Sequence, residues 1–334
     1  METFKAIIVR EVDDRIEFQL ENTTLDDLSP GEVLIKVSYS SVNYKDMLAV
    51  QKNGGVIRKY PMIPGIDLSG IVVESQDERL SVGQKVIAMS DEIGVSHTGG
   101  YAEYARVNAD SVIPLPDGFS LKDAELYGVA GYTAAASIEA LESLGMSSAD
   151  NPSILVTGST GGVGSIAVQM LIKAGYTNVT ALVRKDYQVD VAKELGAHHI
   201  LQASELLSNN KPLNKRLYHY VIDTVGGEVA AQAMTYIHEN GKMTLCGNAG
   251  GNDFPATVLP MILRGVHLIG ISVVNAPLDE KIKIWGKIAN EWNVSDLVHF
   301  QETNLENISE TFDALHEGRH LGRTIVKISD TEDA

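Results

Sequence analysis

Cysteine is nearly absent from this 334-residue sequence, which contains Cys246 alone. A single cysteine excludes an internal disulfide framework and any zinc site built from several cysteines. Apolar runs are also short, and none reaches the ~18 residues that a membrane-spanning helix needs. The scarcity of cysteine fits a reducing compartment, so we expect a cytoplasmic protein. The short apolar runs lead us to expect a soluble protein that has no membrane as a partner.

Positive charge is also scarce, since 27 Lys and Arg residues face 44 Asp and Glu residues, giving a net charge of −17. A nucleic-acid binder needs a basic footprint, and a protein of anionic membranes needs a basic face. We therefore expect no nucleic acid among its partners. The hydrophobic share of 44% and the charged share of 21% are ordinary for a globular chain. At roughly 100–200 residues per domain, the length predicts two domains.

Two patterns follow one another along the chain. The first third contains short apolar segments separated by glycine and proline, which is typical of a small β-barrel or sandwich. From residue 153 onward, strand and helix patterns alternate, which predicts a doubly wound parallel sheet. The strands predicted for that sheet span residues 154–157, 178–183, 199–201, 220–223, 243–246 and 267–272. A last strand at 322–328 lies outside the alternation and is expected to return to the first domain.

The segment from Ile154 to Gly164 has the sequence ILVTGSTGGVG, in which a predicted strand runs through three glycines into a predicted helix. Glycine permits the tight turn, the close approach of a pyrophosphate and the packing of helix on strand. The N-terminus of the helix then offers N–H groups to phosphate. The motif therefore predicts a dinucleotide site, and a glycine-rich turn without a ligand is the alternative. The residues predicted at the phosphates are Thr160, Gly161, Gly162 and Val163.

The second strand of the parallel sheet predicts which dinucleotide binds. An NAD-binding protein usually has an acidic residue at the end of this strand, for the ribose hydroxyls. Here the strand ends in Arg184 and Lys185, and an arginine can neutralise a 2′-phosphate. We therefore predict NADPH rather than NADH, with solvated surface cations as the alternative. Thr224, Cys246 and Gly247 follow later strands at their carboxyl ends and are also predicted to contact the cofactor.

Several segments occur in one order that resembles the medium-chain dehydrogenase/reductase superfamily. The resemblance covers nearly the whole chain, and within the superfamily it is strongest to the zinc-free YhdH/YhfP-type quinone oxidoreductases, which include acrylyl-CoA reductases. The segments that carry it are Asn43-Tyr44-Lys45-Asp46, Pro64–Gly70, Val82–Val86, Gly100–Tyr104 and residues 153–164, with 222–227 and 246–251 pointing to the branch.

The resemblance implies an α/β fold in which a doubly wound Rossmann sheet is inserted into a β-rich, GroES-like barrel domain. We expect residues 125–269 to form the NADP-binding domain. Residues 1–124 and 270–334 are expected to form the GroES-like catalytic domain. The resemblance also implies a homodimer that pairs through the edge strand Leu268–Ser272.

The sequence departs from zinc alcohol dehydrogenases where those enzymes bind their metal. Ser41–Asp46 contains no cysteine, and Ile66 stands where their histidine ligand would be. The segment from 90 to 100 is short and lacks the four cysteines of their structural zinc lobe. Zinc-assisted alcohol oxidation requires a bound Lewis acid. Because the residues that would bind the zinc are missing, we expect no metal site and a different chemistry.

That chemistry, as the resemblance implies it, is the transfer of a hydride from NADPH to the activated C=C of an enoyl thioester or enone, as in an acrylyl-CoA reductase. The negative charge that develops on the substrate oxygen needs hydrogen-bond donors. The resemblance offers Asn43 and Tyr44 as these catalytic donors, with Tyr44 also beside the cofactor, and it brings Arg323 back toward the cofactor.

Several alternatives remain open at this stage. Quinone reduction is the alternative chemistry on the same scaffold, and a non-catalytic NADPH-binding sensor is the alternative of another class. Asn43 could fix the backbone instead of contacting substrate, and Asp67 could either bond to backbone or orient an active-site neighbour. The basic residues of the loop at 52–59 could contact a CoA phosphate or simply be solvated; they are Lys52, Arg58 and Lys59.

Overall fold

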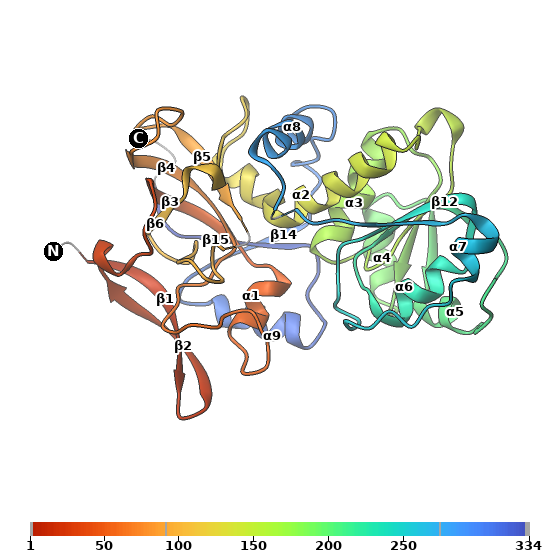
Figure 1. Ribbon diagram of the computed structural model, residues 1–334, viewed down its shortest axis with the longest axis horizontal. Coiled ribbons are helices and arrows are strands. Elements are labelled where there is room, and N and C mark those ends of the chain that lie inside the picture. The colour runs from red at the N-terminus through yellow and green to blue at the C-terminus, as the bar shows by residue number, and fades with distance from the viewer. Residues whose placement is uncertain (1–2, 91, 274, 331–334) are drawn as a thin grey trace. The chain divides into compact units, whose positions relative to one another are not determined.

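The computed structural model describes residues 3–90, 92–273 and 275–330 of the chain (Figure 1). The chain forms two compact units. Unit 1 comprises Met1–Val129, Val274–Ala289 and Phe300–Ala334, and unit 2 comprises Ala130–Val273 and Asn290–His299. The chain thus passes from unit 1 to unit 2 and back twice. Residues 1–2 and 331–334 of the predicted catalytic domain lie outside the described residues.

Unit 2 contains a six-stranded sheet in the order β10-β9-β8-β11-β12-β13, with every pair parallel. This order confirms the doubly wound sheet predicted from the sequence. The central strands are buried on both faces, which explains why they consist of consecutive apolar residues. The strands are β8 (Ile154–Val156), β9 (Val179–Val183), β10 (His199–Gln202), β11 (Tyr218–Asp223), β12 (Ile237–Leu245) and β13 (His267–Gly270).

The helices of unit 2 connect these strands in sequence (Figure 1). They are α3 (Gly162–Lys173), α4 (Gln188–Glu194), α5 (Ala203–Leu207), α6 (Gly227–Met234) and α7 (Leu259–Arg264). Apolar side chains from α6 join residues of β11 and β12 in one core cluster. Ala230 and Met234 of α6 are completely buried in this cluster, so the helix shields this face of the sheet from solvent.

Unit 1 contains a mixed sheet in the order β14-β15-β3-β4-β5-β7, with β6 also paired to β3, and a separate hairpin of β1 and β2. The last strand, β15, pairs with β3 so that Ile325 lies opposite Ser41, which confirms its predicted return to the first domain. The strands are β1 (Phe4–Val12), β2 (Arg15–Thr23), β3 (Val33–Ser41), β4 (Asp67–Ser75), β5 (Lys85–Met89), β6 (Tyr104–Val107), β7 (Val112–Pro114), β14 (Phe300–Asn304) and β15 (Arg323–Lys327).

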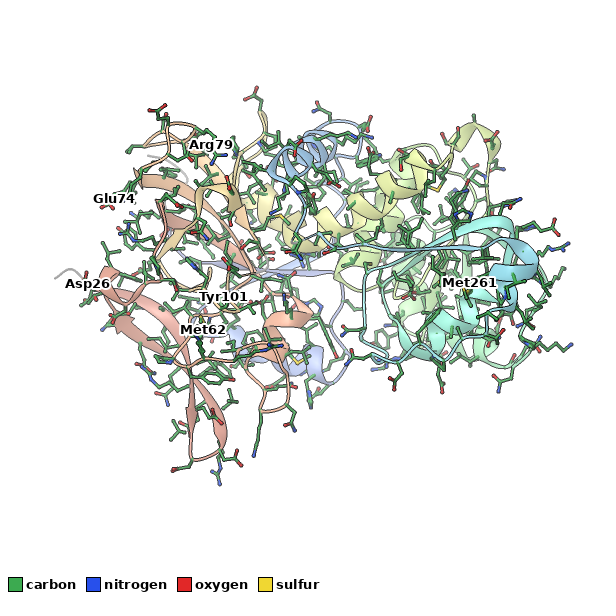
Figure 2. All side chains as sticks on the ribbon, viewed as in Figure 1. Asp26, Met62, Glu74, Arg79, Tyr101 and Met261 are labelled. Carbon is green, nitrogen blue, oxygen red and sulfur yellow. The ribbon has the colours of Figure 1, made fainter. Side chains whose placement is uncertain are left out.

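Three shorter helices and part of a long one complete unit 1. They are α1 (Tyr44–Ala49), α8 (Leu278–Ala289), α9 (Ile308–His316) and the start of α2 (Leu121–Ser143). Tyr101, labelled in Figure 2, is completely buried in the core, and its hydroxyl donates to the Ser41 carbonyl at 3.0 Å. This bond ties the end of β3 to the segment before β6.

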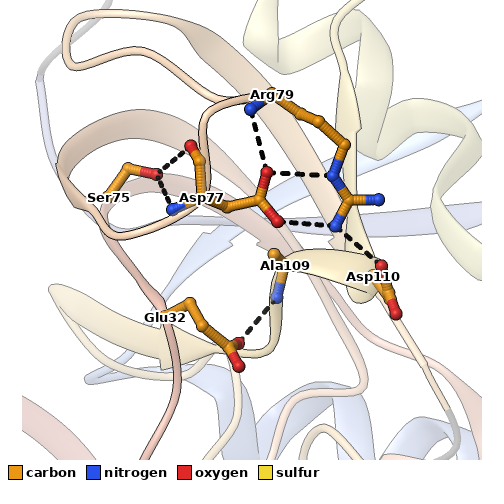
Figure 3. Close-up of polar contacts among 6 residues, drawn as sticks. All are labelled: Glu32, Ser75, Asp77, Arg79, Ala109 and Asp110. Carbon is orange, nitrogen blue, oxygen red and sulfur yellow. Dashed lines mark hydrogen bonds and ion pairs between the residues drawn. The ribbon is translucent and has the colours of Figure 1, made fainter.

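Polar contacts on the surface of unit 1 fix the turn between β4 and β5 (Figure 3). The Arg79 guanidinium donates to Asp77 at 2.7 Å and to Asp110 at 2.8 Å. Glu32 accepts a hydrogen bond from the Ala109 N–H at 3.1 Å. The Arg79 hydrogen bonds hold the pKa of Asp77 at about 2, so the carboxylate stays ionised at neutral pH.

Several elements of unit 1 were not anticipated from the sequence, among them β2, β14, α1 and α9. Strand β14 is mostly polar and exposed, so it lacks an apolar pattern. Strand β2 alternates polar residues with Ile16, Phe18 and Leu20, so it carried the signal of a half-buried strand, which was overlooked. Within the described residues, no helix combines the length and the apolar character needed to cross a membrane.

Candidate functional site

The turn after β8 has glycines where no side chain fits. A Cβ on Gly164 would lie 2.2 Å from the carbonyl oxygen of Gly158, far inside van der Waals contact. Gly158 has a φ of 58°, and a Cβ there would lie 2.4 Å from Thr224 Oγ1. Helix α3 begins at Gly162 directly after this turn, with Gly161 as its N-cap residue. Its first turn has N–H groups without an intrahelical acceptor, which suits an anion.

The loops after β11 and β12 continue this surface. A Cβ on Gly247 would lie 1.9 Å from the Thr224 carbonyl oxygen, and one on Gly226 would lie 2.7 Å from the Gly247 carbonyl oxygen. The two loops therefore touch backbone to backbone. We call the three segments 157–163, 224–227 and 246–251, at the carboxyl ends of neighbouring strands, the glycine cradle.

Asp223 holds the cradle together from below. This residue is completely buried at the end of β11. One carboxylate oxygen accepts from the Thr157 hydroxyl at 2.6 Å, and the other accepts from the Gly226 N–H at 2.8 Å. Burial raises the pKa of Asp223, while these hydrogen bonds oppose the shift. Sequence reasoning missed this residue, although an aspartate that ends a buried strand is a usable signal.

Two predicted cofactor residues, Thr224 and Cys246, donate their side-chain hydrogen bonds to backbone carbonyls of the protein. The Thr224 hydroxyl donates to the Thr157 carbonyl at 2.8 Å, so it faces a ligand as an acceptor only. The Cys246 thiol donates to the Asp223 carbonyl at 3.1 Å. Burial raises the pKa of Cys246 to about 12, which leaves the thiol protonated at neutral pH and unsuited to nucleophilic attack.

Arg184 and Lys185 lie at the end of β9, the strand that pairs with β8. The side chain of Gln188 fixes their backbone, since its Oε1 accepts from the Arg184 N–H at 2.8 Å and the Lys185 N–H at 3.0 Å. The Lys185 ammonium lies 5.8 Å from the centre of the Tyr187 ring. Arg184 is exposed at this turn. Gln188 and Tyr187 were missed at the sequence level, because only the charges drew attention there.

These residues fit a dinucleotide. The cradle presents backbone where a Cβ would collide with a neighbouring loop, so a pyrophosphate can approach closely. Thr160, Gly161, Gly162 and Val163 form the turn and the first residues of α3, as predicted for a phosphate site. An exposed arginine at the end of the adjacent strand suits a phosphate on the adenosine ribose.

A second cluster lies inside unit 1, and we call its members the buried charge network. Ionisable and hydrogen-bonding side chains from five elements or their flanks meet there, each no more than 9% exposed. They are Ser41, Asn43, Asp46, Asp67, Glu125 and Arg323.

Asp67, at the start of β4, is the hub of this network. Its Oδ1 accepts from the Ser41 N–H at 3.1 Å, and its Oδ2 accepts from the Val129 N–H at 2.8 Å. The Asn43 amide also donates to Oδ2, at 3.0 Å. The hydrogen bond to backbone considered from the sequence is thus confirmed. The contact with Asn43 shows that Asp67 orients a candidate site residue as well.

Arg323 is 1% exposed, and its guanidinium is saturated inside unit 1. Its five N–H groups face five acceptors at 2.7–3.5 Å, namely the carbonyls of Val42, Glu125 and Leu126 and the side chains of Ser41 and Asn43. The Arg323 side chain therefore has no N–H group left over for the predicted contact with the cofactor. Its physical role in unit 1 is to neutralise and hold the network.

Asn43 and Tyr44 differ in what they can offer a ligand. The Asn43 amide donates to Asp67 and to Ser41 Oγ, and its oxygen accepts from Arg323 at 3.2 Å. Both ends of this side chain are thus engaged within the protein. Tyr44, the first residue of α1, is 37% exposed and keeps its ring accessible. The arrangement favours a backbone-fixing role for Asn43, while Tyr44 remains the accessible hydrogen-bond donor.

Asp46 fixes the start of α1. Its carboxylate accepts from the Asn43 N–H at 2.9 Å and from the Ile66 N–H at 3.1 Å. Burial, with the negative charge of Asp67 as a smaller cause, raises the pKa of Asp46 to about 7. Asp46 is therefore partly protonated at neutral pH, which lessens the excess of negative charge in the network.

Ile66 stands where the resemblance places the histidine ligand of zinc alcohol dehydrogenases, and its side chain is 3% exposed. Among the residues that the structure describes, no group of three or more His, Cys, Asp or Glu side chains could hold a metal ion. In the basic loop, Lys52 forms an ion pair with Asp14, whereas Arg58 and Lys59 are exposed.

Models of two protein families match the chain. Residues 29–117 match the alcohol dehydrogenase GroES-like domain, and residues 162–288 match the family described as zinc-binding dehydrogenase. The first match lies in unit 1, and the second covers the 224–227 and 246–251 segments of the glycine cradle and the end of its first segment. The chain belongs to the medium-chain dehydrogenase/reductase superfamily, and it is an oxidoreductase of that superfamily.

Curated relatives match almost end to end. YhfP of Bacillus subtilis, named as a candidate quinone oxidoreductase, is 40% identical over 97% of this chain and 99% of its own length. The acrylyl-CoA reductase AcuI of Ruegeria pomeroyi is 36% identical over 98% of this chain and 99% of its own length. Both names belong to the branch that the sequence resembles.

Solved structures share the fold. The YhdH oxidoreductase of Salmonella enterica, in complex with NADP, is 37% identical with a TM-score of 0.93, covering 97% of this chain and 100% of its own. The Bacillus subtilis protein YhfP, with NAD bound, is 40% identical with a TM-score of 0.93, covering 98% of this chain and 100% of its own. These matches confirm the predicted α/β fold with a GroES-like domain and a Rossmann domain.

Proposed function

We propose that this protein is an NADPH-dependent reductase that works without zinc and transfers a hydride to the activated C=C of an enoyl thioester or enone. The observation that carries the proposal is the glycine cradle with Arg184 at the end of the neighbouring strand. We assign cofactor binding to unit 2. We assign substrate binding to unit 1, with domain limits close to residues 124 and 270.

NADPH is favoured over NADH by the charge at the end of β9. An acidic residue there would accept hydrogen bonds from the ribose hydroxyls, whereas Arg184 can pair with a 2′-phosphate. The Salmonella relative was crystallised with NADP, which supports this preference. The Bacillus subtilis relative was crystallised with NAD, so the preference in this chain must come from its own residues.

The bound cofactor supplies the hydride, and the protein supplies orientation and electrostatic stabilisation. In our proposal Thr160, Gly161, Gly162 and Val163 hold the pyrophosphate through the turn and the first turn of α3. Thr224, Cys246 and Gly247 shape the cradle beside the nicotinamide half through their backbone. These assignments extend the sequence prediction.

Tyr44 is proposed as the hydrogen-bond donor to the oxygen on which negative charge develops. It is exposed at the N-terminus of α1, so its hydroxyl is accessible to a ligand. Asn43 is proposed to act through its neighbours, since both ends of its amide are engaged.

The substrate class rests on two relatives. The name of AcuI specifies an acrylyl thioester, which supports an enoyl thioester here. The name of YhfP points to a quinone, which keeps quinone reduction as the alternative. Hydride addition to either acceptor places negative charge on an oxygen of the conjugated carbonyl system. Both reactions therefore need a hydrogen-bond donor such as Tyr44.

A panel of acceptors tests the proposal. Purified protein is mixed with NADPH and, separately, an enoyl-CoA, an enone and a quinone, and loss of the nicotinamide absorbance is followed. We expect the highest kcat/KM with a short enoyl-CoA. A higher value with the quinone would establish the alternative. NADPH binding without oxidation by any acceptor would refute the enzymatic proposal and favour a sensor.

We also propose that the protein acts as a homodimer in the cytoplasm. The edge strand β13 pairs only with β12 within the described residues, so one side of its backbone is available to a second copy. Cys246 is a free thiol, which suits a reducing compartment.

A further inference from the structure

Helix α2 is broken at Gly128, whose φ of 50° and ψ of −151° are not helical. A break inside a helix leaves carbonyl groups before it and N–H groups after it without helical partners. Arg323 donates to the carbonyls of Leu126 and Glu125, at 3.1 and 3.4 Å. Asp67 accepts from the Val129 N–H at 2.8 Å. A cation thus caps the first half of α2, and an anion caps the second, as the helix dipole favours.

The break lies directly against the buried charge network. A Cβ on Gly128 would lie 2.6 Å from Asp67 Oδ2 and 2.8 Å from Ser41 Oγ. The absence of a side chain therefore lets the backbone of α2 reach the carboxylate. Because Asp67 also holds the Asn43 amide, the break in α2 and the start of α1 share one anchor.

Glu125 belongs to the same contact but receives no hydrogen bond. It is completely buried, and neither carboxylate oxygen has a donor among the described residues. The negative charge of Asp67 is close enough to raise the pKa of the Glu125 carboxyl group. The nearby Ser41 hydroxyl already donates to Asp67 and accepts from Arg323, so it is not available as a donor to Glu125.

The charge balance of the network requires a proton. Three buried carboxyl groups, Asp46, Asp67 and Glu125, surround one guanidinium, that of Arg323, and the phenol of Tyr101 lies beside them. Burying an unpaired carboxylate is strongly unfavourable. Burial, followed by the charge of Asp67, raises the pKa of Glu125 well above its ordinary value, while Arg323 opposes the shift. A neutral Glu125 has one O–H to donate, and Asp67 is the charged carboxylate whose interaction raises the pKa of Glu125.

We propose that Glu125 is a positioning residue: a neutral carboxylic acid that donates a hydrogen bond to Asp67 and, through Asp67 and Asn43, holds Tyr44 in place. The connection to Tyr44 is short, since Asn43 caps α1 and Tyr44 is its first residue. The importance of Glu125 for turnover rests on the proposed function, whereas its protonation and its effect on α1 do not.

Two variants separate the proton from the volume of the side chain. Glu125→Gln keeps a neutral hydrogen-bond donor of similar size, and Glu125→Leu keeps the volume without any donor. Glu78→Gln, in an exposed loop of unit 1, is the matched control. All three are compared with the wild-type chain by hydrogen exchange of the 43–49 backbone amides, by infrared spectroscopy and by NADPH turnover with the best acceptor of the panel.

The infrared spectrum reports the proton directly. Wild-type protein at neutral pH should show the C=O stretch of buried carboxylic acids, to which Asp46 also contributes. The component due to Glu125 should be lost from Glu125→Gln and kept in Glu78→Gln. An unchanged spectrum in Glu125→Gln would overturn the proposal. This measurement decides the matter even if Glu125→Leu fails to fold.

The effect on α1 and on turnover separates positioning from a general structural role. Glu125→Leu should exchange the 43–49 amides at least tenfold faster and lose at least tenfold in kcat, with the Kd for NADPH within twofold of wild type. Glu125→Gln should retain both wild-type properties. We expect kcat of wild type to fall at high pH, where Glu125 ionises, and Glu125→Gln should lack this fall. Wild-type exchange and kcat in Glu125→Leu would overturn the proposal. If no acceptor of the panel causes the wild-type protein to oxidise NADPH, the proposed function fails. Hydrogen exchange and infrared spectroscopy still test the role of Glu125 in that case.

Discussion

In our proposal, Arg184 is the single residue that sets which cofactor the cradle prefers. The Arg184→Asp variant removes the partner of the 2′-phosphate and adds a like charge to it. A charge-assisted hydrogen bond contributes about 1.5–3 kcal/mol, so the Kd for NADPH should rise about 10- to 100-fold, and the Kd for NADH much less. Fluorescence titration with each cofactor measures this. Lys215→Asp, exposed elsewhere in unit 2, is the control. Equal weakening of both cofactors would contradict the assignment.

Asp46 makes the stability of the protein depend on pH. Its pKa of about 7 in the folded protein is above its ordinary value of 3.8. Between these values the folded state holds a proton that the unfolded state releases. The free energy of unfolding should therefore fall as pH rises from 4 to 7, with a slope of at most about 1.4 kcal/mol per pH unit from this group.

Denaturant unfolding at several pH values measures that slope. Asp46→Asn cannot ionise, so its slope between pH 4 and 7 should be shallower than that of wild type. Asp77→Asn should keep the wild-type slope in this window, because the pKa of Asp77 is lowered to about 2 and its contribution is lost only in stronger acid. An unchanged slope in Asp46→Asn would show that the proton lies elsewhere.

At the scale of elements, the two halves of α2 depend on one glycine. Gly128→Ala forces a Cβ into a conformation that suits only glycine and to within 2.6 Å of Asp67. The free energy of unfolding should fall by at least about 1–3 kcal/mol, the usual cost of such backbone strain. Gly286→Ala in α8 has no atom within 4 Å of the new Cβ, so it should be neutral or slightly stabilising. Equal thermal unfolding temperatures for the two variants would contradict this account.

The sequence predicted the elements whose signal is local. Strands β8 to β13 were found because consecutive apolar residues alternate with helical patterns, and the first segment of the cradle was found because the glycine motif at 158–164 follows a strand. The buried charge network could not be found in this way. Its members are separated by as many as 282 residues between Ser41 and Arg323, and each looks like an isolated polar residue in the sequence. The resemblance to a family directed Arg323 toward the cofactor, whereas its hydrogen bonds show where its charge is used.

At the scale of the whole molecule, acidity is compatible with anionic ligands because the cations are local. The net charge is −17, yet the end of β9 carries adjacent cations, and the basic loop of unit 1 exposes Arg58 and Lys59. In our proposal, phosphate recognition thus depends on the placement of these cations rather than on the total charge. Binding of NADPH through one such site should weaken only modestly with salt, unlike the binding of a polyanion.

Apolar exposure on unit 2 argues for association of two copies. Helix α7 immediately precedes the edge strand β13 in the chain, and its Ile262 and Leu263 are 70% and 60% exposed. Exposed aliphatic side chains and an unpaired strand edge in the same unit favour an interface in which β13 pairs with its copy. Light scattering over a range of concentrations should therefore give the mass of a dimer. Ile262→Lys should shift it toward the monomer, whereas Val82→Lys, 68% exposed in unit 1, should not. A wild-type monomer at all concentrations would refute the dimer, and a dimer unaffected by Ile262→Lys would place the interface elsewhere.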